Sequence, residues 1–262
     1  MFKMKIDPNI LRKHILDMVY DKQSGHIGGS FSICEIVAYL YSNYDLINKD
    51  KLILSKGHGV PAIYAALHEL GYIENFDLFR EINSPLQGHP DKNKLKYIHA
   101  TTGSLGQGLS IAIGHALACK LKKLDNKIFC IVGDGEMQEG QIWEAFMLAP
   151  KLKLDNLICI IDYNKFQSEG PTENLLERLA VKIRAFNWIT CEIDGNDLDQ
   201  INKSLICYNN EIKDNWYSKP YCIIAHTRKG AGISFLENTN CHSMILSEEQ
   251  YKLALKELND KI

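Results

Sequence analysis

Residues 128–164, IFCIVGDGEMQEGQIWEAFMLAPKLKLDNLICIIDYN, contain the pattern that decides the fold. Two short apolar runs, residues 128–132 and 156–162, flank a stretch with helical periodicity from about Glu139 to Leu152. Short apolar runs separated by a helix are typical of a β-α-β unit whose parallel strands are buried on both faces. We therefore predict a strand, a covering helix and a second, neighbouring strand in this segment.

The same alternation extends outward over most of the chain. Further strands are predicted at residues 51–55, 188–194 and 221–226. Helices are predicted at about residues 9–21, 32–44, 61–70, 175–186 and 198–208, from residue 248 onward, and from the glycine-rich segment 101–108 through Leu121. This order predicts the α/β class, with a mostly parallel, doubly wound sheet in a three-layer α/β/α arrangement. We expect residues 1–262 to form a single domain.

The composition excludes several classes of protein. Of the 262 residues, 30 are Lys or Arg and 32 are Asp or Glu, so the formal net charge is −2. A general nucleic-acid binder is expected to be basic. No run approaches the roughly 18 apolar residues of a membrane span, and the start of the chain lacks the apolar core of a signal peptide. We expect a cytoplasmic protein with no nucleic-acid or membrane partner.

Two polar residues follow the strands of the first β-α-β unit. Asp134 comes directly after the first strand, between Gly133 and Gly135, and Asn164 follows the second strand 30 residues later. Since neighbouring parallel strands end at the same edge of a sheet, where ligands usually bind, we expect the two side chains to lie close together. Their oxygens suit Mg²⁺, and the following helix can direct N–H groups at a diphosphate. Taken alone, however, Gly-Asp-Gly is more typical of an ordinary strand-to-helix turn.

Three of the nine histidines, His26, His58 and His89, lie in turns beside glycine. Such turns can present an imidazole to a cleft, and imidazole transfers protons near neutral pH. A single histidine in a turn is more often a local hydrogen-bonding residue, so the residues alone leave both interpretations open. His14 and His68 lie in helical patterns, where packing is the default, and no HxH or HExxH spacing indicates zinc.

The complete set of motifs resembles the transketolase family. IVGDGEMQEG followed by DYNKFQSEG is similar to the thiamine-diphosphate motif of transketolases. Five further segments match the family in order and approximate spacing: SGHIGGSFS, LILSKGHGVPAIYAAL, GHPDKN, TTGSLGQGLSIAIGHALA and TRKGAGISFLEN. The matched segments run from about Ser24 to Asn238, which is most of the chain. The resemblance implies a thiamine-diphosphate-binding fold.

The resemblance also implies the roles of individual residues. It implies that Mg²⁺ is bound by Asp134, Asn164 and the backbone carbonyl of Phe166. It implies that sugar oxygens are contacted, and protons transferred, by His26 and His89, with His242 as a further histidine that faces both cofactor and substrate. The cofactor-binding residues that it implies are His58, Gly103, Ser104, Leu105, Gly135, Glu139, Asn164 and His242.

Two positions depart from the family pattern. Ile27 stands where transketolases usually have proline, which bears on how His26 is presented. Residues 241–244 read Cys-His-Ser-Met, where the family more often has Trp-His-Gly or Val-His-Gly, so His242 has the weakest match. Glu139 and Glu144 resemble the acidic cluster at the subunit interface of transketolases, and are equally explained as acidic residues at a helix N-terminus.

The resemblance covers only the first of the three transketolase domains. It implies that a partner, a C-terminal subunit with the pyrimidine-binding domain, supplies a glutamate to the cofactor. It further implies a split transketolase that assembles as a dimer of heterodimers and transfers a two-carbon ketol unit from a ketose to an aldose, using sugars or sugar phosphates. Two alternatives remain open: a subunit of another thiamine-diphosphate enzyme, similar to deoxyxylulose-phosphate synthase or a 2-oxo-acid dehydrogenase, and a non-catalytic cofactor-binding module.

Overall fold

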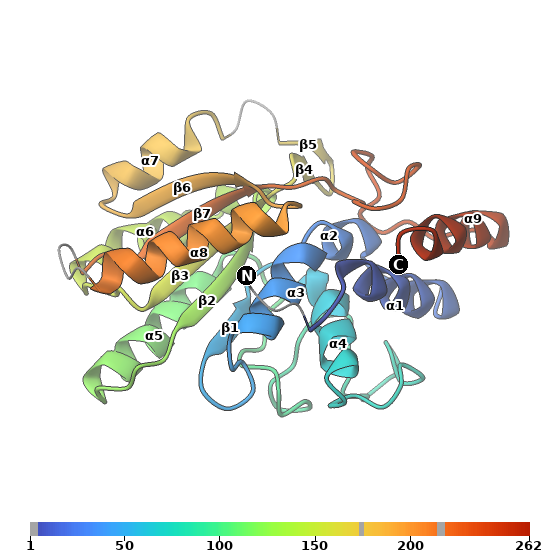
Figure 1. Cartoon of the computed structure of the whole chain (residues 1–262), viewed down its shortest axis with the longest axis horizontal. Coiled ribbons are helices and arrows are strands. Elements are labelled where there is room, and N and C mark those ends of the chain that lie inside the picture. Colours follow the sequence, from blue (N-terminus) through green and yellow to red (C-terminus); the bar gives the residue numbers. More distant parts are fainter. Residues whose placement is uncertain (1–4, 173–175, 214–217) are drawn as a thin grey trace.

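Five parallel strands form the central sheet in the computed structural model, which describes residues 5–172, 176–213 and 218–262. The strands lie in the order β1-β2-β3-β7-β6 (Figure 1). Their bounds are β1, Lys51–Leu54; β2, Ile128–Gly133; β3, Leu157–Tyr163; β6, Ile189–Asp194; and β7, Tyr221–His226. The sequence predicts all five, and the parallel α/β architecture is confirmed.

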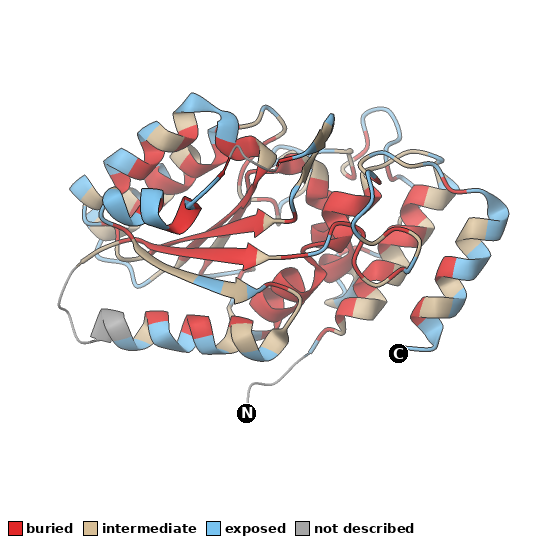
Figure 2. Ribbon diagram, turned by 90° about the horizontal axis from the view of Figure 1, so that it is seen from above, coloured by how far each residue is buried: buried red, intermediate tan, exposed pale blue. Residues whose placement is uncertain are grey.

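Helices cover both faces of the sheet, which makes three layers (Figure 1). One face packs against α5 (Gln107–Leu121), α6 (Gly140–Lys151) and α7 (Leu179–Ala185), and the other carries the remaining long helices. Within β2, Cys130 belongs to the core of the first face and Ile131 to the core of the second. Because successive side chains of a strand point to opposite faces, a continuous apolar run serves both cores. Figure 2 shows the central strands almost entirely buried, whereas the edge strand β6 is intermediate or exposed.

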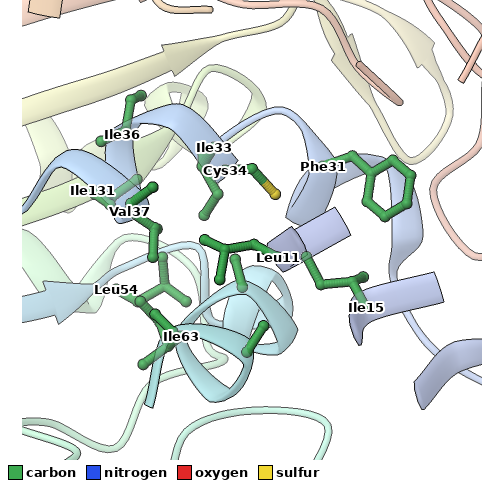
Figure 3. Close-up of a cluster of buried hydrophobic side chains, with 14 of the residues drawn as sticks. Leu11, Ile15, Phe31, Ile33, Cys34, Ile36, Val37, Leu54, Ile63 and Ile131 are labelled. Atoms are coloured by element: carbon green, nitrogen blue, oxygen red, sulfur yellow. The ribbon is translucent and has the colours of Figure 1, made fainter. Parts of the chain in front are cut away.

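The second core is the larger one, and it contains the N-terminal part of the chain. Its helices are α1 (Pro8–Asp21), α3 (Cys34–Asn43), α4 (Val60–Glu69), α8 (Leu198–Lys213) and α9 (Glu248–Asn259). Figure 3 shows Leu11 and Ile15 of α1 in one cluster with Ile63 of α4, and all three side chains are buried. The packing of α1 on α4 therefore rests on apolar contact.

Local signals in the sequence explain where these helices begin. The Asp7 side chain accepts a hydrogen bond from Asn9 N at 2.7 Å, and Pro8 occupies the first turn of α1. Helix α9 begins with a capping box in which Ser247 and Gln250 exchange hydrogen bonds. Both arrangements satisfy N–H groups that the helix itself leaves unpaired. Among the described residues, no helix is long and apolar enough to cross a membrane.

Some predicted boundaries are wrong. The sequence predicts a turn at SGHIGGS, but Ile27–Phe31 forms a short helix, α2. The helix predicted from residue 175 begins, as α7, at Leu179, and residue 175 lies outside the described residues. A small hairpin of β4 (Phe166–Gln167) and β5 (Gly170–Pro171) is not expected from the sequence. These elements depend on tertiary contacts more than on local periodicity.

Candidate active site

A cleft of about 400 Å³ opens beyond the carboxyl ends of β1, β2 and β3. This central cleft is lined by His26, Gly29, Lys56, His58, His89, Gly103, Leu105, Gly133, Asp134, Gly135, Glu136, Gln138, Glu139, Asn164, Phe166, Gln167, Ser168, Glu169, Lys229 and His242. It lies where open parallel sheets generally bind ligands. The structure thus brings together residues from motifs that are widely separated in the sequence.

Asp134 and Asn164 lie side by side because β2 and β3 pair in register. Gly133 is the partner of Asp162, so the residues that follow the two strands meet at the same edge. The Asp134 carboxylate accepts hydrogen bonds from Gly135 N at 2.8 Å and, through its other oxygen, from Lys165 N at 2.6 Å. These bonds hold the carboxylate between the two loops that follow the strands.

Asp162 orients the Asn164 side chain. Its carboxylate accepts a hydrogen bond from Asn164 Nδ2 at 2.8 Å, and it also accepts hydrogen bonds from Ser32, Lys56 and Thr227. Because the amide nitrogen is held by Asp162, the carboxamide oxygen is directed away from it, and Phe166 N donates to that oxygen at 3.1 Å. Asp162 is fully buried and Lys56 is 1% exposed, so this ion pair is screened from water.

The electrostatic surroundings of Asp134 and Asn164 fit a divalent cation. Asp134 is 1% exposed, and burial, followed by the nearby Asp162 carboxylate, raises the pKa of Asp134 to about 6. A buried carboxylate beside a second one is stabilised by a positive ion. A carboxylate oxygen of Asp134 and the carboxamide oxygen of Asn164 are hard donors of the kind that Mg²⁺ uses. The donor set is therefore compatible with the predicted metal site.

The cleft also contains four histidines whose rings lie close together. The ring centroid of His26 lies 5.5 Å from that of His58, 5.7 Å from that of His89 and 5.0 Å from that of His242. The His58 and His242 rings are also 5.0 Å apart. His26 is therefore the central member of this group, and His242, which has the weakest match to the family pattern, contacts both His26 and His58.

The surroundings of these histidines favour the neutral imidazole. Burial, followed by the charge of His242, lowers the pKa of His26 to about 4, and burial, followed by Lys229, lowers the pKa of His242 to about 4. Burial also lowers the pKa values of His58 and His89. The buried Nδ1 of His26 has no hydrogen-bond partner among the described residues. Unpaired imidazole nitrogens in a cleft can bind the hydroxyl groups of a ligand.

Two glycines allow the backbone to approach the cleft closely. Gly103 has φ +146°, and a Cβ there would lie 3.1 Å from the His89 ring. A Cβ on Gly135 would lie 2.9 Å from the Gln167 side chain. Any larger residue would push these neighbours into the cleft or strain the backbone. Both glycines are among the predicted cofactor-binding residues.

The remaining predicted residues are placed differently. Leu105 lines the cleft, whereas Ser104 is exposed and is not among the residues that line it. Glu139 is exposed at the rim and packs against Gly106, and Glu144 is exposed on α6 outside the cleft. Ile27, which replaces the usual proline, is the first residue of α2 and is fully buried. Proline is favoured at this position of a helix, and isoleucine begins the helix there too.

Sequence reasoning missed three positively charged residues beside the cleft. Lys56 lies within LILSKGHG and Lys229 within TRKGAGISFLEN, but neither pattern indicated a role for the lysine. Both line the cleft, and the Lys229 ammonium lies 5.7 Å from the centre of the Phe166 ring. Arg80 contributes a third positive charge, which lowers the pKa values of His26 and His89. The position of Lys56 directly beyond a strand end is the signal that could have found it. These residues place positive charge beside the histidines, while Asp134, Glu136, Glu139 and Glu169 also line the cleft.

Comparison with known proteins agrees with this geometry. The family described as transketolase, thiamine diphosphate binding domain, matches residues 5–259. The chain is 44% identical over 263 residues to the 6-deoxy-6-sulfo-D-fructose transketolase subunit SqwG of Clostridium sp. (strain MSTE9), covering 95% of this chain and 94% of that protein. It is 37% identical over 268 residues to an apulose-4-phosphate transketolase subunit of Phocaeicola vulgatus, covering 96% and 92%.

A solved structure also shows similarity to transketolases. The crystal structure of transketolase from Campylobacter jejuni superposes with a TM-score of 0.87 at 33% identity, over 98% of this chain and 42% of the other. The chain thus spans less than half of that transketolase. This chain belongs to the transketolase family and corresponds to its thiamine-diphosphate-binding domain.

Proposed function

We propose that this chain binds thiamine diphosphate together with Mg²⁺ in the central cleft and acts as the N-terminal subunit of a two-subunit transketolase. The observation that carries the proposal is the joint position of Asp134 and Asn164 in one cleft with four histidines from distant turns. In this proposal, Mg²⁺ is held by the Asp134 carboxylate, the Asn164 carboxamide oxygen and the Phe166 carbonyl. The other thiamine-diphosphate enzymes are disfavoured by the two relatives, which are named as transketolase subunits.

The protein's own residues would bind and orient the reactants. Thiamine diphosphate, when bound, supplies the carbanion chemistry that breaks and forms bonds beside a carbonyl. The diphosphate would be faced by Lys56, Lys229 and His58. These residues supply hydrogen-bond donors and positive charge in the cleft that contains the proposed Mg²⁺ ligands. His26, His89 and His242 would bind sugar hydroxyls and transfer protons at those oxygens.

The substrate is proposed to be a ketose with an anionic group. The two relatives are named for 6-deoxy-6-sulfo-D-fructose and apulose 4-phosphate. A sulfonate or phosphate is attracted to positive charge, and Arg80 lies close enough to lower the pKa values of two cleft histidines. We propose transfer of a two-carbon unit from such a ketose to an aldose.

The partner is proposed to be a second chain that carries the pyrimidine-binding domain. Both relatives are named as subunits of a transketolase, which implies a further subunit for each of them. We propose the same division here, with residues 1–262 as one domain, assembly as a dimer of heterodimers, the acidic Glu139 and Glu144 near the subunit interface, and a cytoplasmic location.

Removal of the metal tests the proposal. We expect thiamine diphosphate to raise the melting temperature only when Mg²⁺ is present, because a ligand that binds only the native state stabilises it by mass action. Asp134→Ala should abolish this shift without unfolding the protein. The measurement is a melting scan with cofactor, with Mg²⁺ or with a chelator, on the chain alone and with its partner.

A matched control separates loss of the metal site from general damage. Asp194 also ends a parallel strand, β6, but is exposed and does not line the cleft. Asp194→Ala should keep the cofactor-dependent shift. An equal shift in the presence of the chelator would contradict the assignment of Asp134 and Asn164 as metal ligands.

A further inference from the structure

A second group of metal-binding side chains lies between α1 and α4, outside the central cleft. His14 Nε2 lies 2.8 Å from Glu69 Oε1, and the ring centroids of His14 and His68 are 4.8 Å apart. One ligand atom from each of the three residues lies within 4.8 Å of the others. Within residues 5–172, 176–213 and 218–262, this is the one such group of His, Cys, Asp and Glu side chains.

The hydrogen bond of His68 prepares one ligand. Its Nδ1 lies 2.8 Å from the backbone oxygen of Ile73. A carbonyl oxygen only accepts hydrogen bonds, so Nδ1 must carry the proton, which leaves a lone pair on Nε2. A metal-binding histidine usually donates its other ring N–H to a carbonyl or carboxylate in this way, which sets the tautomer and the ring orientation.

Neighbouring groups hold the site in shape and leave it accessible. The Phe76 ring packs against both imidazoles, with centroids 5.4 Å from His14 and 4.7 Å from His68. The two helices that carry the ligands are joined by the buried cluster of Leu11, Ile15 and Ile63 (Figure 3). Glu69 is exposed and lines an open groove of about 830 Å³, so this ligand can be reached from solvent.

We propose that His14, His68 and Glu69 bind a divalent transition-metal ion, with Zn²⁺ as the best fit. Two imidazoles and a carboxylate form a ligand set that Zn²⁺ accepts, with water in the fourth position. Ligands about 2.0 Å from a tetrahedral ion lie about 3.3 Å apart. The 2.8 Å contact between His14 and Glu69 therefore has to open slightly, and the longer separations in the group, of up to 4.8 Å, have to close, by side-chain rotation.

The bound ion would cross-link α1 and α4. Helix α1 leads into His26, and α4 directly follows the turn that contains His58. A link between the middle of α1 and the C-terminal end of α4 strengthens the support of both histidines without touching the reactants. The site does not depend on the proposed function, because none of its three ligands lines the central cleft.

Zinc binding by matched variants tests the proposal. Purified chain is saturated with thiamine diphosphate and Mg²⁺, and Zn²⁺ affinity and stoichiometry are measured by equilibrium dialysis, with melting scans in parallel. We expect the wild type to bind one equivalent more tightly than Glu69→Gln or His68→Ala, by at least tenfold, and to melt at higher temperature with Zn²⁺. Glu69 is exposed, so Glu69→Gln remains informative if His68→Ala fails to fold.

The control uses the second His–Glu contact among the residues that the structure describes. His226 Nε2 lies 2.9 Å from Glu192 Oε2, as in the first pair, but this pair is not part of a three-ligand group among the described residues. Glu192→Gln should keep the tight equivalent. Equal zinc affinity in the wild type, Glu69→Gln and His68→Ala would overturn the proposal, and so would a loss caused only by Glu192→Gln.

Discussion

At the scale of single residues, His58 and His89 lie in the same cleft with different surroundings. His58 packs within 3.2 Å of the position that a Cβ of Gly29 would occupy, close to Lys56. His89 packs against Gly103. Burial, followed by the charge of Arg80, lowers the pKa of His89. In the proposed function, His58 faces the diphosphate and His89 the sugar, so the two histidines should have separable effects.

We predict that His58→Ala weakens cofactor binding, whereas His89→Ala lowers turnover and leaves cofactor affinity nearly unchanged. A lost hydrogen bond to a charged group costs roughly 1.5–3 kcal/mol, which corresponds to about tenfold or more in affinity. Cofactor titration of both variants, followed by assay with the partner present, checks this. The reverse pattern would show that the two roles had been exchanged.

The low pKa values of the cleft histidines predict how stability depends on pH. An unfolded histidine has a pKa of about 6.5, whereas the pKa values of folded His26 and His242 are about 4. Between these values the unfolded chain binds more protons, so the free energy of unfolding should fall as the pH drops from about 6.5 to 4. Above a pH of about 6.5 both states are neutral at these positions, and this effect vanishes.

Urea unfolding of the cofactor-free chain at about pH 7 and about pH 5, on either side of the unfolded pKa, measures this dependence. His26→Gln removes one of the titrating groups, so the loss of stability between the two pH values should be smaller in the variant. An equal loss in wild type and variant would contradict a buried, neutral His26.

At the scale of elements, α2 shows how one small helix positions two histidines. His26 immediately precedes it, and Gly28 N donates to the backbone oxygen of Cys241 at 3.0 Å. A Cβ at Gly28 would lie 2.6 Å from Cys241 Sγ and 2.7 Å from Cys241 O. The absence of a side chain at Gly28 therefore lets the segment with His242 dock against α2.

We predict that Gly28→Ala destabilises the protein by about 1–3 kcal/mol, as overpacking of a filled space usually does, and also weakens cofactor binding by displacing His242. Gly114→Ala is the matched control, because a Cβ there meets nothing within 4 Å in the exposed part of α5. That change should stabilise the helix by up to about 1 kcal/mol. Denaturant unfolding and cofactor titration of both variants check the prediction, and equal effects would contradict it.

At the scale of the whole molecule, the chain corresponds to only part of a full-length transketolase. It covers 94% of its relative from Clostridium but only 42% of the transketolase from Campylobacter jejuni. In the proposed two-subunit enzyme, a separate chain completes the site. The exposed apolar residues Met147 and Leu148 of α6 lie on the same helix as Glu144 and are compatible with an interface there.

We predict that the chain alone shows no ketol transfer and that adding a pyrimidine-domain subunit restores it. The physical reason is that the glutamate expected to activate the cofactor lies on the pyrimidine-binding domain of the partner. The measurement is a coupled assay with ketose donors that carry a sulfo or phosphate group, compared with pyruvate, on the purified chain and on the mixture. Robust turnover by this chain alone, with contaminating transketolase excluded, would refute the two-subunit proposal.

The local sequence pattern is sufficient to predict the strands and helices and the order of the motifs. All five strands of the sheet are predicted, because strand and helix periodicities are properties of neighbouring residues. The pairing of the β2 and β3 ends also follows from the sequence, since a crossover of one helix usually joins adjacent parallel strands. The sequence alone therefore places Asp134 and Asn164 together.

Tertiary structure alone decides the contacts between distant residues. The sequence contains no sign that Lys56 pairs with Asp162, 106 residues away, or that the His242 ring lies 5.0 Å from that of His26. The same holds for His14 and His68, which occupy two helices whose patterns indicate only ordinary packing. Such contacts depend on how helices and loops pack in three dimensions, and periodicity along the chain carries no information about that packing.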